Sequence, residues 1–261
     1  PGFDVAGTVV AIGAKVSRVA VGDEVFGVSR GSFAQFAVAR ADKLCHKPEN
    51  LTFEQAAVLG ISALTALTAL TDSARLQAGQ RVLIVGASGG VGTFAVQIAV
   101  AMGAKVTGVC SPAKVDLVAS LGAERVIDYT SSDFADGSQR HDVVVDIGGC
   151  SSVSRLRRAL TPTGTLVIVG GEGGGRWSPG MGRQLLAVIL SGFVAQRLTM
   201  AICKEHHSGL EQLARLAAHG QITPVIERSF PLEQAGDAMR HLEAGKARGK
   251  DVVMVDTAGR L

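Results

Sequence analysis

Hydrophobic and polar residues alternate in short runs over roughly the first 63 residues of the chain. Three runs have the length of half-buried strands and are separated by glycine-containing turns: Val5–Ile12, Glu24–Val28 and Phe33–Val38. Short strands joined by tight turns are typical of antiparallel sheets and barrels. We therefore expect residues 1–63 to form a barrel-like, antiparallel β-domain.

From about residue 64 to residue 223, apolar runs alternate with stretches of helical periodicity. The apolar runs predict strands at Arg81–Val85, Lys105–Cys110, Arg125–Tyr129, Asp142–Asp146, Thr165–Val169 and Leu198–Cys203. The helical stretches predict helices over 90–102, 112–121, 151–160, roughly 182–194 and 209–219. The last of these helices would begin with a capping box of Ser208 and Glu211 and stop at Gly220. This alternation indicates an α/β fold with a doubly wound parallel sheet.

The last segment, residues 224–261, returns to shorter elements. Its pattern predicts a strand near Val225–Arg228, a helix, and a strand at Asp251–Val255, the helix having on one face Leu232, Ala235, Met239 and Leu242. No low-complexity linker separates the three regions. The simplest organisation is two close-packed domains, with the chain crossing between them near residues 60–66 and 222–226.

The junction between the first parallel strand and its helix is rich in glycine, and its sequence is Val82-Leu83-Ile84-Val85-Gly86-Ala87-Ser88-Gly89-Gly90-Val91-Gly92. The spacing Ala87-x-Gly89-x-x-Gly92 is that of a dinucleotide-binding turn with alanine in the first glycine position. Free backbone N–H groups and the positive end of the helix dipole meet at such a turn and attract anions. We interpret the turn as a dinucleotide site formed by Ala87, Ser88, Gly89, Gly90 and Val91. The alternative is a tight turn with a purely structural role.

The end of the second parallel strand carries another cofactor signal. NAD sites usually place Asp or Glu here to hold the ribose 2′-hydroxyl, and that carboxylate would repel a 2′-phosphate. Cys110 and Ser111 occupy the position, and along the chain no acid follows until Asp116. Lys114 lies in the first helical turn, where it opposes the helix dipole unless an anion compensates it. Ser111 and Lys114 are therefore candidates to bind the 2′-phosphate of NADPH, and they also fit an N-cap and an ordinary surface lysine.

Three more candidates lie at or just beyond the ends of the third, fourth and fifth parallel strands. Tyr129, the only tyrosine, ends the third strand, where it would either flank the phosphate on the adenosine ribose or pack as an edge aromatic. Gly148 and Gly170 begin the glycine pairs that follow the fourth and fifth strands. Ligands of open α/β sheets bind outside the carboxyl ends of the strands, and glycine lets the backbone approach them closely. Plain turn formation explains both glycine pairs equally well.

Composition narrows the classes of function. Apolar residues make up 47% of the chain, as expected for parallel strands covered on both faces, and the longest apolar run is too short to span a bilayer. The net charge of +3 comes from scattered Lys and Arg, which argues against a nucleic-acid partner. Four cysteines without a C-x-x-C pair argue against a zinc knuckle and a disulfide framework, and they fit a reducing cytoplasm. No signal peptide is recognisable, and we expect the native N-terminus to lie upstream of Pro1.

Five segments, in their order along the chain, resemble the medium-chain dehydrogenase/reductase superfamily in its zinc-independent, quinone-oxidoreductase-like branch. They are Phe3–Val10, Val21–Gly27, Ala56–Gly60, the turn at 86–92, and Thr223–Ile226 through Arg248–Lys250. The resemblance implies an N-terminally truncated GroES-like β-barrel domain (1–63), completed by the C-terminal segment (224–261). This domain would pack on a Rossmann domain (64–223) with NAD(P) in the cleft. It also implies that Thr65 approaches the nicotinamide.

The resemblance fails at the zinc positions. Zinc-using relatives carry Gly-His-Glu where this chain has Gly2-Phe3-Asp4, and a cysteine near Ile61. Phenylalanine and isoleucine cannot ligate zinc, and the cysteine-rich lobe that holds the structural zinc is missing. We therefore expect no bound zinc and no metal-ligating residue.

Without zinc, the acceptor itself has to accommodate the negative charge that develops during reduction. Reduction of a simple ketone concentrates charge on oxygen, which zinc or a positioned acid would stabilise, whereas a conjugated acceptor spreads that charge. We expect an NADPH-dependent reductase of quinones or α,β-unsaturated carbonyls, with no identifiable catalytic acid. An alcohol or aldehyde dehydrogenase and a non-catalytic NADPH-binding sensor or partner-binding protein remain alternatives. The exposed edge predicted at Leu198–Cys203 favours a homodimer.

Overall fold

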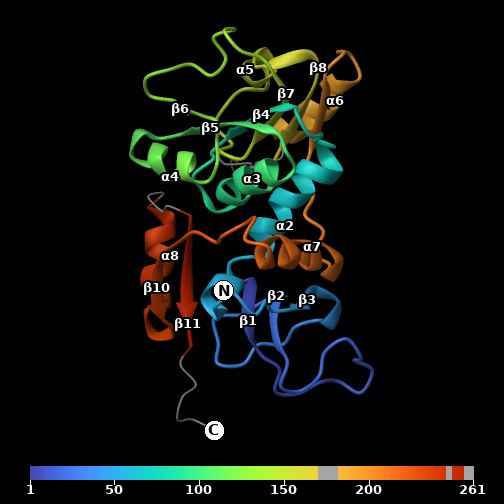
Figure 1. Cartoon of the computed structure of the whole chain (residues 1–261), viewed down its shortest axis with the longest axis vertical. Coiled ribbons are helices and arrows are strands. Elements are labelled where there is room, and N and C mark those ends of the chain that lie inside the picture. Colours follow the sequence, from blue (N-terminus) through green and yellow to red (C-terminus); the bar gives the residue numbers. More distant parts are fainter. Residues whose placement is uncertain (170–181, 245–248, 256–261) are drawn as a thin grey trace. The chain divides into compact units, whose positions relative to one another are not determined.

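The computed structural model describes residues 1–169, 182–244 and 249–255 (Figure 1). The chain divides into two compact units, Pro1–Leu64 with Lys204–Leu261, and Thr65–Cys203. Helix α2 (Ile61–Thr68) contains the first junction between the units. Among the helices in the described ranges, none is both long and apolar enough to cross a membrane.

The unit Thr65–Cys203 is built on a six-stranded parallel sheet with the order β6-β5-β4-β7-β8-β9. Its strands are β4 (Arg81–Val85), β5 (Lys105–Cys110), β6 (Arg125–Asp128), β7 (His141–Asp146), β8 (Leu160–Ile168) and β9 (Arg197–Met200). The central strands are buried on both faces, which explains their continuous apolar sequences. The strand order reverses at β4, and this confirms the predicted doubly wound α/β fold.

Helices connect the strands of this sheet (Figure 1). Helix α3 (Gly90–Ala101) packs against β4 and β5, and α4 (Val115–Ser120) packs against β5 and β6 after the 3₁₀ turn η3 (Pro112–Lys114). Helix α5 (Val153–Arg158) packs against β8, and α6 (Gly182–Ser191) packs against β9. Right-handed crossovers running in opposite directions from β4 place these two pairs of helices on opposite faces. A π-helical turn, η2 (Ala69–Ser73), continues α2.

The unit formed by the two ends of the chain contains two small sheets. The first is antiparallel, with the order β1-β2-β3, and consists of β1 (Asp4–Thr8), β2 (Glu24–Val28) and β3 (Leu44–His46). The helices η1 (Ala41–Lys43), α1 (Phe53–Ala57) and α7 (His207–Ala218) lie against this sheet or beside its strands. The second sheet is a parallel pair, β10 (Ile226–Pro231) and β11 (Lys250–Met254), joined through η4 (Leu232–Gln234) and α8 (Ala235–Glu243).

The predicted strand at Phe33–Val38 is wrong. This segment forms bends, with Phe36 and Val38 exposed at 61% and 94%. A strand needs a hydrogen-bonded neighbour, and both sides of β2 are already paired, with β1 and with β3. The third strand is therefore Leu44–His46, whose three residues are too few to show a period of two.

The predicted capping box of Ser208 and Glu211 is also wrong. His206 is the N-cap of α7, and its side chain accepts a hydrogen bond from the Ser208 N–H. The Glu211 carboxylate instead pairs with His207 and with Arg18. Contacts of α7 place the helix in the unit formed by the chain ends, so the chain returns there at residue 204, earlier than the expected 222–226.

Candidate functional site

Most of the predicted site residues lie at the carboxyl edge of the parallel sheet. The carbonyl oxygen of Val109, near the end of β5, accepts hydrogen bonds from the N–H groups of Gly86 and Ala87, both at 3.0 Å. The carbonyl oxygen of Val85, at the end of β4, accepts one from the N–H of Gly148 at 3.1 Å. These bonds fix the glycine-rich turn between the ends of β5 and β7.

The glycines of the turn are required by its geometry. Gly86 has a φ of +86°, and a Cβ there would lie 2.8 Å from the backbone nitrogen of Gly148. A Cβ at Gly92 would lie 2.1 Å from the carbonyl oxygen of Gly86. Gly86 is absent from our sequence-derived candidates, although the end of the apolar run at Val85 marks it as the first residue of the turn.

The N-terminus of α3 supplies the electrostatic character of this edge. The first N–H groups of a helix have no partner within it, and the helix dipole adds partial positive charge. Gly89 is the N-cap of α3, and the first turn contains no acidic residue. Because the Ser88 side chain is buried, the backbone N–H groups are the main donors there. The turn also lies where the strand order reverses, between β4 and β7, which is where doubly wound sheets bind ligands. This close-fitting backbone cradle suits a pyrophosphate group.

The adjoining ends of β5 and β6 bring charged groups together. Cys110 pairs with Asp128 in the ladder. Burial raises the pKa of the Cys110 thiol, the Asp128 carboxylate raises it further, and the Lys114 ammonium lowers it. Hydrogen bonds from the Thr130 N–H and hydroxyl, at 2.9 and 2.8 Å, hold the pKa of Asp128 below its usual value. Asp128 is therefore an anion beside the proposed phosphate position, which reasoning along the chain alone missed.

Ser111 and Lys114 occupy the turn η3 at this point. Ser111 is the N-cap of η3, but its hydroxyl makes no capping hydrogen bond. Lys114 ends η3, precedes α4 and is half-buried. Ser111 is therefore the N-cap residue by position, as the sequence predicts, but its side chain does not cap the turn.

Tyr129 follows β6, and its backbone N–H donates to the Cys110 carbonyl at 3.3 Å. Its side chain is 56% exposed and borders an open depression of about 330 Å³, which is also lined by Thr130, Ser131, Ser132, Asp133 and Arg155. Arg155 pairs with Asp133 at 2.8 Å, which lowers the pKa of Asp133. The depression therefore offers mainly hydroxyl groups.

Two predicted site residues remain. Thr65 lies in α2 and is half-buried. Gly170 lies outside the described residues.

A polar cluster lies beside Phe3 and Ile61, the positions at which the family resemblance expects zinc ligands. One oxygen of Asp4 accepts from the Ile61 N–H at 2.7 Å, and the other accepts from Lys250 Nζ at 3.3 Å. Lys250 Nζ also donates to the Ser62 hydroxyl at 3.0 Å. A Cβ at Gly60 would lie 2.3 Å from an Asp4 oxygen, so glycine allows this approach. Asp4 and Lys250 are too far apart in sequence for any spacing rule to connect them.

This cluster does not fit a catalytic zinc ion. Phe3 and Ile61 carry no ligand atom, and both oxygens of Asp4 already accept hydrogen bonds. No reaction step through zinc follows from these residues.

Comparison with known proteins adds to this geometry. The model of the alcohol dehydrogenase GroES-like domain matches residues 1–49, and that of a zinc-binding dehydrogenase matches residues 121–253. The chain is 35% identical to the mitochondrial NAD(P)H oxidoreductase RTN4IP1 of Mus musculus, over 97% of this chain and 70% of that protein. It is 33% identical to the 2-methylene-furan-3-one reductase of Solanum lycopersicum, over 97% of this chain and 63% of that protein. The solved quinone oxidoreductase of Coxiella burnetii superposes with a TM-score of 0.85 at 30% identity, covering 98% of this chain and 79% of that one.

Proposed function

Because the chain belongs to the medium-chain dehydrogenase/reductase superfamily, in its quinone oxidoreductase-like branch, we propose that it uses NADPH, without zinc, to reduce quinones or α,β-unsaturated carbonyls. Family membership makes the protein an NAD(P)H oxidoreductase. Two relatives, by their names, act on a quinone and on a 2-methylene-furan-3-one, which is a conjugated enone. The proposal extends these activities to this chain and adds the choice of cofactor.

The observation that carries the cofactor choice is the charge at the carboxyl ends of β5 and β6. A dinucleotide whose pyrophosphate lies on the glycine turn places its adenosine ribose near the end of the next strand. There the chain offers the Lys114 ammonium and the Ser111 hydroxyl, which would bind a 2′-phosphate. Asp128 opposes this contact, but its carboxylate already accepts two hydrogen bonds from Thr130.

In this account the chain mainly binds and orients its ligands. When bound, NADPH supplies the hydride. The backbone N–H groups at the start of α3 would hold the pyrophosphate. Gly148 adjoins the turn through its hydrogen bond to Val85 and, without a side chain, would leave room for the dinucleotide. Thr65 would lie toward the nicotinamide.

The lack of ligand atoms at Phe3 and Ile61 supports conjugated acceptors. Without zinc, the negative charge that develops on the acceptor has to be spread by the acceptor itself. Quinones and enones spread it through conjugation, and saturated ketones do not.

Steady-state oxidation of NADPH in the presence of a chelator tests the proposal. Methyl vinyl ketone and methyl ethyl ketone form a matched pair that differs in conjugation, and a quinone completes the panel. We expect turnover of the quinone and the enone, and a rate with the saturated ketone lower by at least about tenfold. Comparable rates with both ketones would indicate an alcohol dehydrogenase. Tight NADPH binding without any turnover would indicate a sensor, and either result contradicts the proposal.

We also propose a homodimer in a reducing compartment, the cytoplasm. Strand β9 is an edge of the sheet, and α6 beside it exposes four apolar side chains: Leu185, Leu186, Val188 and Ile189. None of the four cysteines, all of which lie within the described residues, forms a disulfide bond. The Mus musculus relative is mitochondrial by name, so cell fractionation decides between the two compartments.

A further inference from the structure

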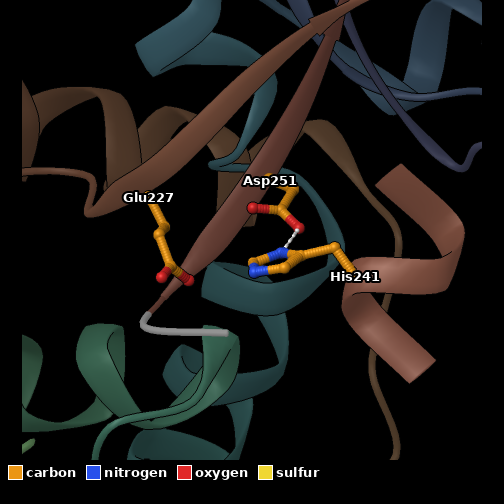
Figure 2. A group of neighbouring side chains, drawn as sticks. All are labelled: Glu227, His241 and Asp251. Atoms are coloured by element: carbon orange, nitrogen blue, oxygen red, sulfur yellow. Dashed lines mark hydrogen bonds and ion pairs between the residues drawn. The ribbon is translucent and has the colours of Figure 1, made fainter. Parts of the chain in front are cut away.

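A cluster of ligand-type side chains lies in the unit formed by the chain ends and takes no part in the sites described above. Glu227 of β10, His241 of α8 and Asp251 of β11 each offer one ligand atom, and these atoms lie within 4.8 Å of one another (Figure 2). Within the described ranges, this is the one group of three or more His, Cys, Asp or Glu side chains that comes so close.

An irregularity in the strand pairing brings Glu227 to this point. Ile226 pairs with Lys250, and Arg228 pairs with Asp251, so Glu227 is an extra residue in β10. Such a bulge sets two residues against one and redirects a side chain. Helix α8 packs against both strands and supplies His241. Three separate elements therefore converge on one place.

Only one of the two carboxylate oxygens of Asp251 has a hydrogen-bond partner. One of its oxygens, Oδ2, lies 2.7 Å from His241 Nδ1, and the side chains of Asp251 and His241 are only 8% and 15% exposed. The other oxygen, Oδ1, is buried and has no hydrogen-bond partner. A buried carboxylate oxygen in this condition is costly and calls for an explanation. Figure 2 shows this oxygen and the second ring nitrogen of His241 on the side where the Glu227 carboxylate lies.

We propose that Glu227, His241 and Asp251 bind a divalent transition-metal ion, with zinc as the best match. One imidazole and two carboxylates suit zinc or manganese, and their two negative charges balance the charge of the ion. The neutral His241 ring binds the ion through a nitrogen that carries no proton, and its Nδ1 hydrogen bond to Asp251 Oδ2 breaks as the ring turns toward the ion. The Oδ1 atom of Asp251 then gains the partner it lacks.

The geometry requires a small contraction on binding. Ligand atoms around tetrahedral zinc lie about 3.3 Å apart, given metal–ligand distances of about 2.0 Å. Separations of up to 4.8 Å close to this value by rotation of the Glu227 and His241 side chains. Three protein ligands leave one position for water.

The role of this ion is structural. It links β10, β11 and α8, and its ligands are different residues from Phe3 and Ile61. The proposal departs from our sequence-based expectation of no metal-ligating residue, which considered the catalytic positions and the cysteines. Zinc-independent reduction and a structural zinc ion are compatible in one chain.

Titration of the chelator-stripped protein with zinc chloride tests the proposal, with a chromophoric chelator as competitor and a parallel titration with manganese chloride. The wild type should bind one zinc per chain. Glu227→Gln, His241→Gln and Asp251→Asn should each weaken zinc binding by at least about tenfold. Asp237→Asn, on the exposed side of α8, and His219→Gln, an exposed histidine, are matched controls and should bind within about twofold of the wild type.

Two further readouts keep the result decisive. Circular dichroism and NADPH affinity report whether each variant is folded, and Glu227→Gln is the mildest change because Glu227 is half-buried. Zinc should raise the Tm of the wild type and of the controls but not that of Glu227→Gln. Equal zinc affinity in the wild type and all three ligand variants, or no zinc binding at micromolar concentration, overturns the proposal. None of these outcomes depends on which substrate the enzyme reduces.

Discussion

Replacement of Lys114 by alanine tests the proposed contact between the Lys114 ammonium and the 2′-phosphate of NADPH. Lys114 ends η3 at the carboxyl edge of the sheet, and its ammonium is close enough to Cys110 to lower the pKa of that thiol. We expect Lys114→Ala to weaken NADPH binding and to leave NADH binding nearly unchanged, because NADH has no 2′-phosphate to pair with the lysine.

The size of the effect follows from the environment of the lysine. A hydrogen bond to a charged group contributes about 1.5–3 kcal/mol. Lys114 is half-buried, so solvent screens the contact only in part. This range corresponds to about a ten- to hundredfold loss in NADPH affinity. Asp128→Asn should act in the opposite direction and strengthen NADPH binding, since it removes a negative charge beside the phosphate position.

Lys105→Ala is the matched control. Lys105 begins β5 at the amino edge of the sheet and is exposed. The two ends of β5 are roughly 16 Å apart at about 3.3 Å per residue. That exceeds the Debye length of about 10 Å at 0.1 M salt, so the control loses the same charge without affecting the cofactor.

Equilibrium titration of both cofactors, by quenching or enhancement of fluorescence, measures these affinities. If Lys114→Ala weakens the binding of NADH and NADPH by the same factor, Lys114 does not bind the 2′-phosphate and the assignment is wrong. An equal loss of NADPH affinity in Lys105→Ala would contradict the assignment as well.

Further predictions concern the metal, the turn, the assembly and the thiols. Chelator treatment should leave the NADPH-dependent activity of Glu227→Gln, whose structural zinc site is impaired, unchanged; activity of this variant that is lost with a chelator and restored by zinc would contradict zinc-free catalysis. Gly92→Ala should lower the free energy of unfolding in urea by about 1–3 kcal/mol, because the new methyl group overlaps the Gly86 carbonyl, and an unchanged midpoint would refute the packing argument. Light scattering should show the full-length protein as a dimer and Leu186→Glu as a monomer; a monomeric wild type at high micromolar concentration would refute the edge pairing. Burial raises the pKa of Cys45 to about 11, so at pH 8 a thiol reagent should label the exposed Cys150 first, and faster labelling of Cys45 would contradict its burial.

The parallel sheet was the most predictable part of the structure. The predicted ranges of β4 and β5 agree with the observed strands residue for residue. Both are buried runs ended by a glycine turn or a proline, so the local sequence contains all the information needed. The Phe33–Val38 run has a similar pattern, yet whether it becomes a strand depends on a partner that local sequence does not specify.

The candidate site was predictable only where it is local in sequence. The turn at 86–92 and the position of Lys114 next to Cys110 follow from neighbouring residues. Asp128 was missed because it comes from the adjacent strand, where the ladder places it opposite Cys110. The proposed metal site was missed because it depends on a β-bulge at Glu227, which no sequence motif predicts.

The position at which hydrogen is delivered tests the central claim most directly. The experiment uses chelator-treated enzyme, an enone, and NADPH that carries deuterium at the transferable position, and mass spectrometry or NMR locates the label in the product. The account predicts a saturated ketone with deuterium on its β-carbon, because in the proposed zinc-free reaction conjugation has to spread the charge that a metal ion would otherwise stabilise. Deuterium on the carbonyl carbon of an allylic alcohol would contradict it.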